Sequence, residues 1–304
     1  MSPIIGRILL MSLTCWTLRL ALGFLLYEGG FVAVAGEWFG TGRPGYAPAD
    51  LLNLYIYGYL GGVSTMTGAA LSSFRLDIVS DTICPWCYVG KRRLAAALPI
   101  LEAEGLTFDV TWRPFQLNPT MPREGLDRRA YRSAKFGSWE KSQALDAQVA
   151  EAGASAGLVF RHDLMAKTPN TVASHALIRL AHETGDAAMQ DRVVEALFSA
   201  YFTQGLDVGD LAVLADLAEG AGIERSRASA FLFEPASFDA VIDDEKLARG
   251  LGLNRVPSFV LGGNYLFSGA QPTSVMVRAL REASEKLISA SQVAAPAEPP
   301  HASA

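Results

Sequence analysis

The sequence predicts an α/β fold that is interrupted by a large all-helical insertion. Three observations support this prediction. A strand, a helix and a second strand follow one another between Phe74 and Trp112, a helical pattern covers roughly residues 125–236, and a strand pattern returns from Ser258. Because half of the 304 residues are apolar and only 19% are charged, the chain can bury a substantial core without help from disulfides or metals.

The strand–helix–strand unit comes first in this pattern. Phe74 to Val79 is a short run rich in strand-forming residues, and it predicts a buried strand that ends at the polar pair Ser80-Asp81. Tyr88 to Glu104 carries apolar residues at near-helical spacing and stops before Gly105, which predicts a helix. Thr107 to Trp112 predicts the second strand. The crossover between the two strands favours a parallel pair.

The middle of the chain is predicted to be helical, with breaks at several glycines. Thr168 is expected to cap a helix that opens with Pro169 and ends at Gly185. The other helices expected in this part are Ala187 to Phe202, Asp210 to Gly220, Glu224 to Phe233 and Phe238 to Leu251.

Strand signals return near the C-terminal end. Ser258 to Leu261 and Tyr265 to Ser268 flank a Gly-rich connection that suits a hairpin. Pro272 is expected to open a last helix that runs to about Ser289. The composition of residues 291–304, mainly Ala, Pro and Ser, predicts a disordered tail.

The N-terminal part, residues 1–72, is Gly-rich and apolar and shows no sustained period. Its uncharged run, Ile8 to Leu18, is too short for a membrane span, so membrane association is not expected. Two interpretations remain open. Residues 1–35 can act as an export signal that ends at the small residues Ala33 to Ala35, or translation can begin at Met66, in which case a cytoplasmic location is expected.

The charge balance argues against one class of partner. The chain has 31 acidic and 26 basic residues and a formal net charge of −5, which gives no basic field for nucleic-acid binding.

The cysteines are few, and their spacing is informative. Cys15 lies far from Cys84 and Cys87, which form a Cys-x-x-Cys pair. Such a pair is either half of a metal site or a redox dithiol. A zinc site needs two more ligands, and the four histidines form no second cluster with metal-like spacing, so no metal site is predicted. The histidines are His162, His175, His182 and His301.

The position of the pair favours redox chemistry. Cys84 stands where the first strand ends and the first helix begins, and the positive end of that helix favours a thiolate, the form that attacks disulfides. Pro85 suits the first helical position, and Cys87 follows one turn later. We expect Cys84 to be the exposed nucleophile and Cys87 the more buried resolving thiol. The competing interpretation is a pair of small buried apolar residues.

Three separated motifs resemble the DsbA family, and most closely its FrnE-like subgroup. They are Ser80 to Gly90 with its Cys84-Pro85-Trp86-Cys87 centre, Trp112 to Pro119, and Val256 to Phe259. The resemblance covers about residues 74–289. It implies a thioredoxin-like fold made of residues 73–124 and 237–290, with the helical insertion at residues 125–236. The segment before Phe74 has no counterpart in the family.

The resemblance also implies a set of site residues. Cys84, Cys87 and Pro257 are expected to be catalytic. Pro257 is expected in the cis form against the cysteine pair, which leaves the Val256 backbone free to pair with an extended substrate. The alternative is an ordinary trans proline at the start of a strand. Asn170 and His175 either orient substrate or are structural. The stretch from Phe115 to Pro119 either lines the substrate groove or packs within its loop. The expected substrate-binding residues are Pro85, Trp86, Val256, Phe115, Asn170 and His175.

The function expected is thiol–disulfide exchange with protein or small-molecule substrates, with no required cofactor and glutathione as an optional one. Trp86 stands where strongly oxidising relatives have a histidine, so we expect a less oxidising couple. Three alternatives remain: a glutathione-dependent isomerase or transferase resembling 2-hydroxychromene-2-carboxylate isomerase and the kappa-class enzymes, which have serine in place of Cys84; a non-catalytic holdase; and a metal-binding module.

Overall fold

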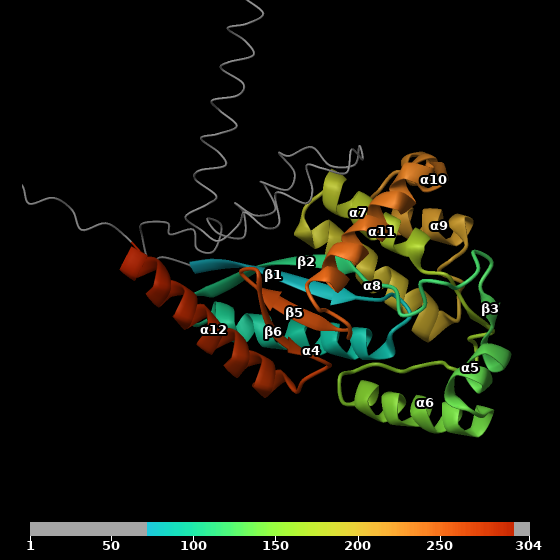
Figure 1. Ribbon diagram of the computed structural model, residues 1–304, viewed down its shortest axis with the longest axis horizontal. Helices are drawn as coiled ribbons and strands as arrows, with labels where there is room; N and C mark the ends of the chain where they lie inside the picture. The colour runs from blue at the N-terminus through green and yellow to red at the C-terminus, as the bar shows by residue number, and fades with distance from the viewer. Residues whose placement is uncertain (1–71, 295–304) are drawn as a thin grey trace, which may run out of the picture. The chain divides into compact units, whose positions relative to one another are not determined.

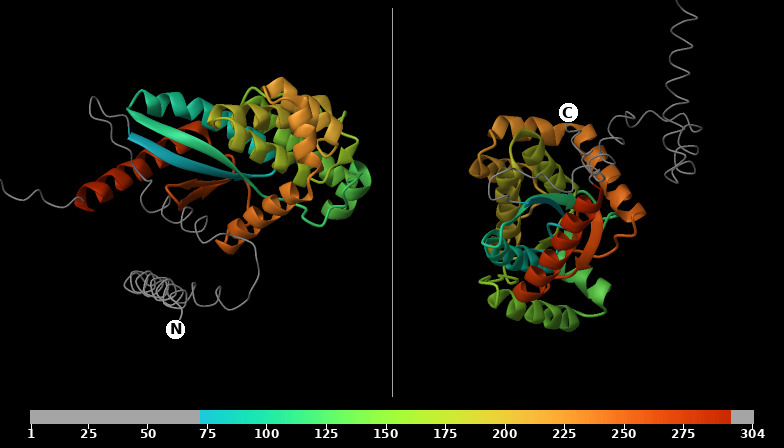
Figure 2. Two further views of the ribbon diagram at one scale, coloured as in Figure 1. Left: turned by 90° about the horizontal axis from the view of Figure 1, so that it is seen from above. Right: turned by 90° about the vertical axis from the view of Figure 1, so that its left-hand side faces the viewer.

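The structure of the protein is a computed structural model that describes residues 72–294, all within one compact unit (Figures 1 and 2). The expectations for the segment before Ser72 therefore lie outside the described residues, as do those for residues 295–304.

The strand–helix–strand unit is present as expected. It consists of β1 (Ser72–Ser80), α4 (Pro85–Glu102) and β2 (Leu106–Pro114). The two strands are parallel, with Phe74 opposite Phe108 and Ile78 opposite Trp112. Residues 76–81 are buried, so the end of β1 that leads to the cysteine pair lies inside the protein.

The C-terminal hairpin completes a four-stranded sheet. β5 (Ser258–Leu261) and β6 (Asn264–Ser268) pair antiparallel, and the strand order is β2-β1-β5-β6. Gly262 and Gly263 make the turn with φ of 54° and 80°, which other residues rarely adopt. α12 (Thr273–Ala294) lies beside α4 next to the sheet (Figure 1). This helix extends past Ser289, so the prediction of a disordered tail is wrong for residues 291–294.

The segment between β2 and β5 is mostly helical, and its helices gather mainly toward the carboxyl ends of β1 and β2 (Figures 1 and 2). The insertion is not entirely helical, because two very short strands, β3 and β4, pair antiparallel within it. The elements are β3 (Leu126–Asp127), α5 (Arg128–Phe136), α6 (Trp139–Ala154), β4 (Lys167–Thr168), α7 (Val172–Thr184), α8 (Ala187–Gln204), α9 (Leu211–Ala221), α10 (Arg225–Phe233) and α11 (Pro235–Gly250).

The expected start of α7 is wrong. Thr168 belongs to β4, where it pairs with Leu126, and the helix begins three residues after Pro169, at Val172. The side-chain oxygen of Asn170 accepts a hydrogen bond from the Val172 amide at 3.0 Å and so satisfies one of the unpaired amides of the first turn. α11 also begins earlier than expected, at Pro235 rather than Phe238, with the proline in the first turn.

The sheet unit and the insertion share one apolar core. Tyr88 of α4 stacks on Phe198 of α8 with ring centroids 5.1 Å apart, and Trp112 of β2 meets the same ring edge-on at 6.3 Å. Both cysteines of the pair belong to this core. The insertion therefore contributes directly to the packing around the helix that carries the cysteines.

Gln190 of α8 joins the insertion to β2, an edge strand of the sheet, through hydrogen bonds. Its side-chain oxygen accepts a hydrogen bond from the Trp112 amide at 2.9 Å, and its side-chain nitrogen donates to the Trp112 carbonyl at 3.2 Å. The buried amide group thus satisfies both backbone groups of Trp112.

Candidate active site

The cysteine pair begins α4. Cys84 is the N-cap residue, with extended backbone angles, and Pro85 occupies the first turn as expected. The Cys84 amide donates to the Asp81 carbonyl at 3.0 Å, which closes the turn between β1 and the helix, and the Cys87 amide donates to the Cys84 carbonyl at 3.0 Å. Both thiols are free. The local geometry therefore brings two thiols together within one helical turn.

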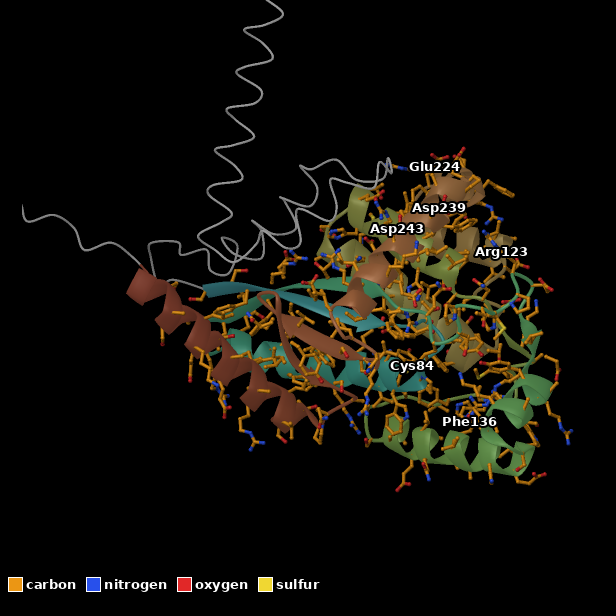
Figure 3. All side chains as sticks on the ribbon, in the orientation of Figure 1. Cys84, Arg123, Phe136, Glu224, Asp239 and Asp243 are labelled. Carbon is orange, nitrogen blue, oxygen red and sulfur yellow. The ribbon has the colours of Figure 1, made fainter. Side chains whose placement is uncertain are left out.

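Exposure at the pair differs from the expectation. Cys84 is only 5% exposed and Cys87 is fully buried, whereas Trp86 between them is 39% exposed. Cys84 is thus the more accessible thiol, but the prediction that it is exposed is wrong. The difference arises because Cys84 packs into the shared core at the start of α4 (Figure 3).

Burial acts strongly on the second thiol. It raises the pKa of Cys87 well above its ordinary value, because the charged form loses its solvation, and the neighbouring Cys84 sulfur and the charge of Asp81 raise it further. Cys87 is therefore the group whose ionisation the protein makes difficult.

The Val256-Pro257 bond is cis, as the resemblance implied, and Pro257 is buried. The Cys84 sulfur lies 3.8 Å from the Val256 carbonyl oxygen and donates a weak hydrogen bond to it. A Cβ added at Gly90 of α4 would lie 3.1 Å from the Pro257 ring, which shows how closely the proline approaches the helix. The Cys84 sulfur therefore lies directly against the backbone at Val256, the position expected to pair with an extended substrate.

Asp81 lies in the turn between β1 and the pair, three residues before Cys84, and is completely buried. One carboxylate oxygen accepts a hydrogen bond from the Leu117 amide at 2.7 Å, and the other lies 3.4 Å from the Ile83 amide and 3.5 Å from His175 Nε2. In the sequence, Asp81 ends the first predicted strand and lies within the motif Ser80 to Gly90, but it was not among the predicted site residues. An acidic residue that directly follows a buried strand and precedes a cysteine pair was the available signal.

The insertion helix α7 covers this corner. The hydroxyl groups of Thr82 and Ser174 are 2.8 Å apart, and His175 Nε2 is 3.2 Å from the Phe115 carbonyl oxygen. All four of these residues are buried. α7 therefore contacts the turn before the cysteines and the loop after β2.

Three residues that were expected to bind substrate contact other groups of the protein instead. They are Phe115, Asn170 and His175. Phe115 is buried beneath the Arg249 guanidinium, 4.1 Å from its ring centre, which agrees with the packing interpretation. Asn170 donates to the Met121 carbonyl at 2.7 Å, and His175 is 2% exposed. In the stretch from Phe115 to Pro119, Leu117 is an apolar residue that reaches solvent, at 40% exposure, whereas Phe115 does not.

A buried network fixes this loop. Glu245 of α11 accepts hydrogen bonds from the Gln116 amide at 3.1 Å and from the Gln116 side chain at 2.8 Å. Arg249 donates to the same carboxylate and to the Gln116 carbonyl, at 2.6 and 2.7 Å. The next residue is Leu117, whose amide donates to the Asp81 carboxylate. By fixing this loop, α11 helps to hold the Asp81 carboxylate beside the cysteine pair.

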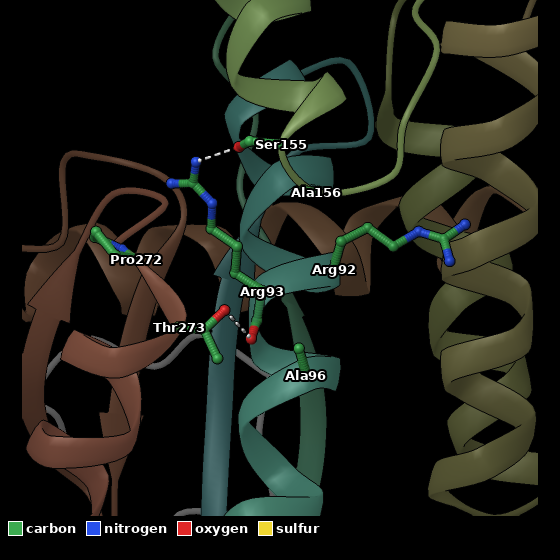
Figure 4. A pocket seen from close by; sticks show the side chains of 7 residues that line it. All are labelled: Arg92, Arg93, Ala96, Ser155, Ala156, Pro272 and Thr273. Carbon is green, nitrogen blue, oxygen red and sulfur yellow. Dashed lines mark hydrogen bonds between the residues drawn. The ribbon is translucent and has the colours of Figure 1, made fainter.

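A cavity of about 380 Å³ lies beside the middle of α4, away from the cysteines (Figure 4). Its Arg93 side chain donates to the Ala270 carbonyl at 2.5 Å and to the Ser155 hydroxyl at 3.2 Å. None of the expected site residues lines it. The lining residues are Arg92, Arg93, Ala96, Ser155, Ala156, Pro272 and Thr273.

Within residues 72–294, no group of three or more His, Cys, Asp or Glu side chains is arranged to hold a metal ion. No helix in that range combines the length and the apolar character needed to cross a membrane.

Comparison with known families agrees with this geometry. The model of the DsbA-like thioredoxin domain matches residues 75–281, which include both cysteines and Pro257. The chain belongs to the DsbA-like thioredoxin domain family.

Among solved structures, a probable DsbA oxidoreductase from Streptomyces coelicolor is 34% identical, with a TM-score of 0.63 over 70% of this chain and 91% of that one. The structure of 2-hydroxychromene-2-carboxylate isomerase shares the fold at 17% identity, with a TM-score of 0.52 over 73% of this chain and all of that one. The uncharacterized protein YwbO of Bacillus subtilis is 24% identical over 69% of this chain and 98% of its own length.

Proposed function

We propose that the protein is a thiol–disulfide oxidoreductase of the FrnE-like subgroup that exchanges disulfides through Cys84 and Cys87. The observation that carries this proposal is the pair of free thiols within the first turn of α4, beside the cis Val256-Pro257 bond. Similarity to the probable DsbA oxidoreductase from Streptomyces coelicolor supports it.

In the reducing direction, the Cys84 thiolate attacks one sulfur of a substrate disulfide. The substrate S–S bond breaks, one substrate thiolate leaves, and Cys84 is joined to the other substrate sulfur. The Cys87 thiolate then attacks the Cys84 sulfur, and the second substrate thiolate leaves. Two electrons pass from the dithiol to the substrate, and a Cys84–Cys87 disulfide remains. The same steps in reverse oxidise a substrate dithiol.

Trapping the mixed disulfide tests this proposal. A Cys87→Ser variant lacks the resolving thiol, so it should accumulate covalent complexes that disappear on reduction, visible on non-reducing gels and identifiable by mass spectrometry. A Cys84→Ser variant is the matched control, because it keeps one thiol of the pair but lacks the nucleophile, and it should form few complexes. Equal trapping by the two variants would contradict the assigned order of attack.

The second candidate is a glutathione-dependent isomerase, which the shared fold with 2-hydroxychromene-2-carboxylate isomerase brings into consideration. The reduction of insulin disulfides separates the two functions, because resolution needs both thiols. The oxidoreductase should lose insulin reduction in Cys87→Ser. An isomerase that uses glutathione should retain its activity in that variant, and this result would overturn the proposal.

A further inference from the structure

The turn that leads to Cys84 lies between two other segments of the chain. β1 has β2 on one side and β5 on the other, and Pro114 of β2 and Ser258 of β5 pair with its last two residues. The loop after β2, residues 115–119, and the segment before β5, residues 251–257, therefore border the turn from opposite sides. Neighbouring strands are about 4.8 Å apart, so these two segments are separated by roughly 10 Å where they leave the sheet.

The segments around the cysteine pair are basic, although the protein as a whole has a formal net charge of −5. α5 lies beyond the end of α4 that carries the pair (Figure 1). Together, α5 and the two segments contain five basic residues and no acidic one. The basic residues are Arg128, Arg129, Arg132 and Lys135 of α5 and Arg255 before β5.

Lys135 is joined to the loop after β2. Its Nζ atom donates to the side-chain oxygen of Asn118 at 2.6 Å and to the Tyr131 hydroxyl at 3.1 Å. Asn118 directly follows Leu117, whose amide donates to the Asp81 carboxylate beside the pair. Lys135 is exposed, and both of its partners are neutral. Its charge therefore faces solvent on this side of the site.

Arg255 lies on the other side. It is exposed, and it directly precedes Val256, whose carbonyl oxygen is 3.8 Å from the Cys84 sulfur. Within residues 72–294, no carboxylate forms an ion pair with Arg255 or with Lys135. The turn that holds Cys84 thus has an exposed cation without a carboxylate partner on each side.

The acidic groups close to the pair do not cancel these charges at the surface. Asp81 is fully buried, and Glu245 is buried and paired with Arg249. Asp127 caps the first turn of α5, at the opposite end of that helix from Lys135. The surface around Cys84 therefore presents positive charge to an approaching substrate.

We propose that Lys135 and Arg255 are specificity-determining residues that select peptide disulfides with acidic residues on both sides of the reacting cysteine. This inference rests on the proposed function and names the substrate class of that site. Roughly 10 Å is the length of about three residues of an extended chain, so one peptide that crosses the site can bring a carboxylate toward each cation. Because both cations are exposed, the attraction acts mainly on association and weakens as salt is added.

Two peptide disulfides of opposite charge test the inference. Each is a disulfide-linked dimer of one short peptide, with Glu on both sides of the cysteine in the acidic form and Lys in the basic form. The reduced full-length protein is mixed with each peptide, and the released thiol peptide is measured by chromatography after an acid quench. Each rate is divided by the rate with dithiothreitol, which corrects for the intrinsic reactivity of the disulfide.

The parent protein should reduce the acidic peptide about tenfold faster than the basic one at low salt, and this ratio should fall toward one at about 0.5 M salt. The double variant Lys135→Gln, Arg255→Gln removes both charges and should lower the low-salt ratio to about one or two. The double variant Lys135→Arg, Arg255→Lys keeps both charges and should keep the parent ratio.

The matched control is Arg278→Gln, Lys286→Gln. It removes the same total charge from exposed positions of α12, which runs away from α5 (Figure 1), and it should also keep the parent ratio. An equal loss of preference in this control would mean that net charge, and not the two cations beside the pair, selects the substrate, and would overturn the inference.

Other results also decide the question. A parent ratio of one, or a parent ratio that persists in Lys135→Gln, Arg255→Gln, overturns the inference, as does loss of the preference in the variant that keeps both charges. If the double variant does not fold, Arg255→Gln alone should lower the ratio to about three, and an unchanged ratio there overturns the inference. A folded parent protein that reduces neither peptide would contradict the proposed function itself.

Discussion

Trp86 is the more exposed of the two residues between the cysteines. The Trp86→His variant places a group that can be cationic next to Cys84, and a cation stabilises the thiolate of the reduced form. We expect the equilibrium with glutathione to move about three- to tenfold toward the reduced dithiol, as measured by thiol alkylation in defined glutathione buffers.

Tyr265→His is the matched control for this prediction, because Tyr265 is an exposed aromatic residue on the β5–β6 hairpin. It should leave the equilibrium unchanged. If Trp86→His has the same equilibrium with glutathione as the parent protein, the residue at position 86 does not affect the redox equilibrium of the Cys84–Cys87 pair.

His162 links stability to pH. Its ring stacks on Phe160, and burial lowers its pKa below the ordinary value, with the charges of Arg128 and Arg132 acting in the same direction and Asp146 opposing them. As the pH falls below the unfolded-state value of about 6.5, the unfolded chain takes up the proton first. The stability linked to this group is therefore present above about pH 6.5 and is lost as the pH falls through the folded-state pKa.

The His162→Gln variant should accordingly lose less melting temperature than the parent protein between pH 7.5 and 5.5, as measured by thermal unfolding followed by circular dichroism. The same decrease in both proteins would mean that other groups cause the acid sensitivity.

Among the helices, α11 acts on the site through Glu245. In Glu245→Ala, the buried amide and side chain of Gln116 and the guanidinium of Arg249 lose their common partner. Groups left unpaired in this way typically cost about 2–4 kcal/mol in the free energy of unfolding. Urea denaturation measures the change.

Asp239→Ala, at an exposed position of the same helix, is the control for Glu245→Ala and should change stability by less than about 0.5 kcal/mol. A comparably small effect of Glu245→Ala would show that the loop after β2 does not depend on this carboxylate.

The start of a helix could be predicted from the sequence where neighbouring residues fix it, and not where a contact with a distant segment does. α9 (Leu211–Ala221) could be predicted to within one residue at each end, and its start is set locally, because the Asp210 side chain caps it through the Ala212 amide. The start of α7 could not, since Thr168 is drawn into pairing with Leu126, a contact with a distant segment. The same distinction applies to the site. Cys84, Cys87 and Pro257 lie in local motifs, whereas the meeting of Asp81 with His175 and Leu117 depends on tertiary packing.

At the scale of the whole unit, the sheet and the insertion should unfold together, because Tyr88, Trp112 and Phe198 pack in one core. In urea, far-UV circular dichroism and the accessibility of Cys87 to alkylation, measured in a Cys15→Ser, Cys84→Ser protein, should give coincident transitions. Phe198→Ala should shift both together and lower the free energy of unfolding by about 3–5 kcal/mol.

Phe233→Ala, at an exposed phenylalanine of α10, is the control for Phe198→Ala and should change stability by less than about 0.5 kcal/mol. Separate transitions for the two probes would show that the helices between β2 and β5 form an independent folding unit.

The contact between Gln190 and Trp112 affects whether the edge of the sheet can pair with a strand of another protein molecule. β2 forms one edge of the sheet, and strand edges with unpaired backbone groups can recruit strands from other chains. At Trp112, both backbone groups already bind the glutamine side chain. An incoming strand would have to displace that side chain and leave its amide buried without a partner, so this border of the sheet resists intermolecular β-pairing and the aggregation that follows from it.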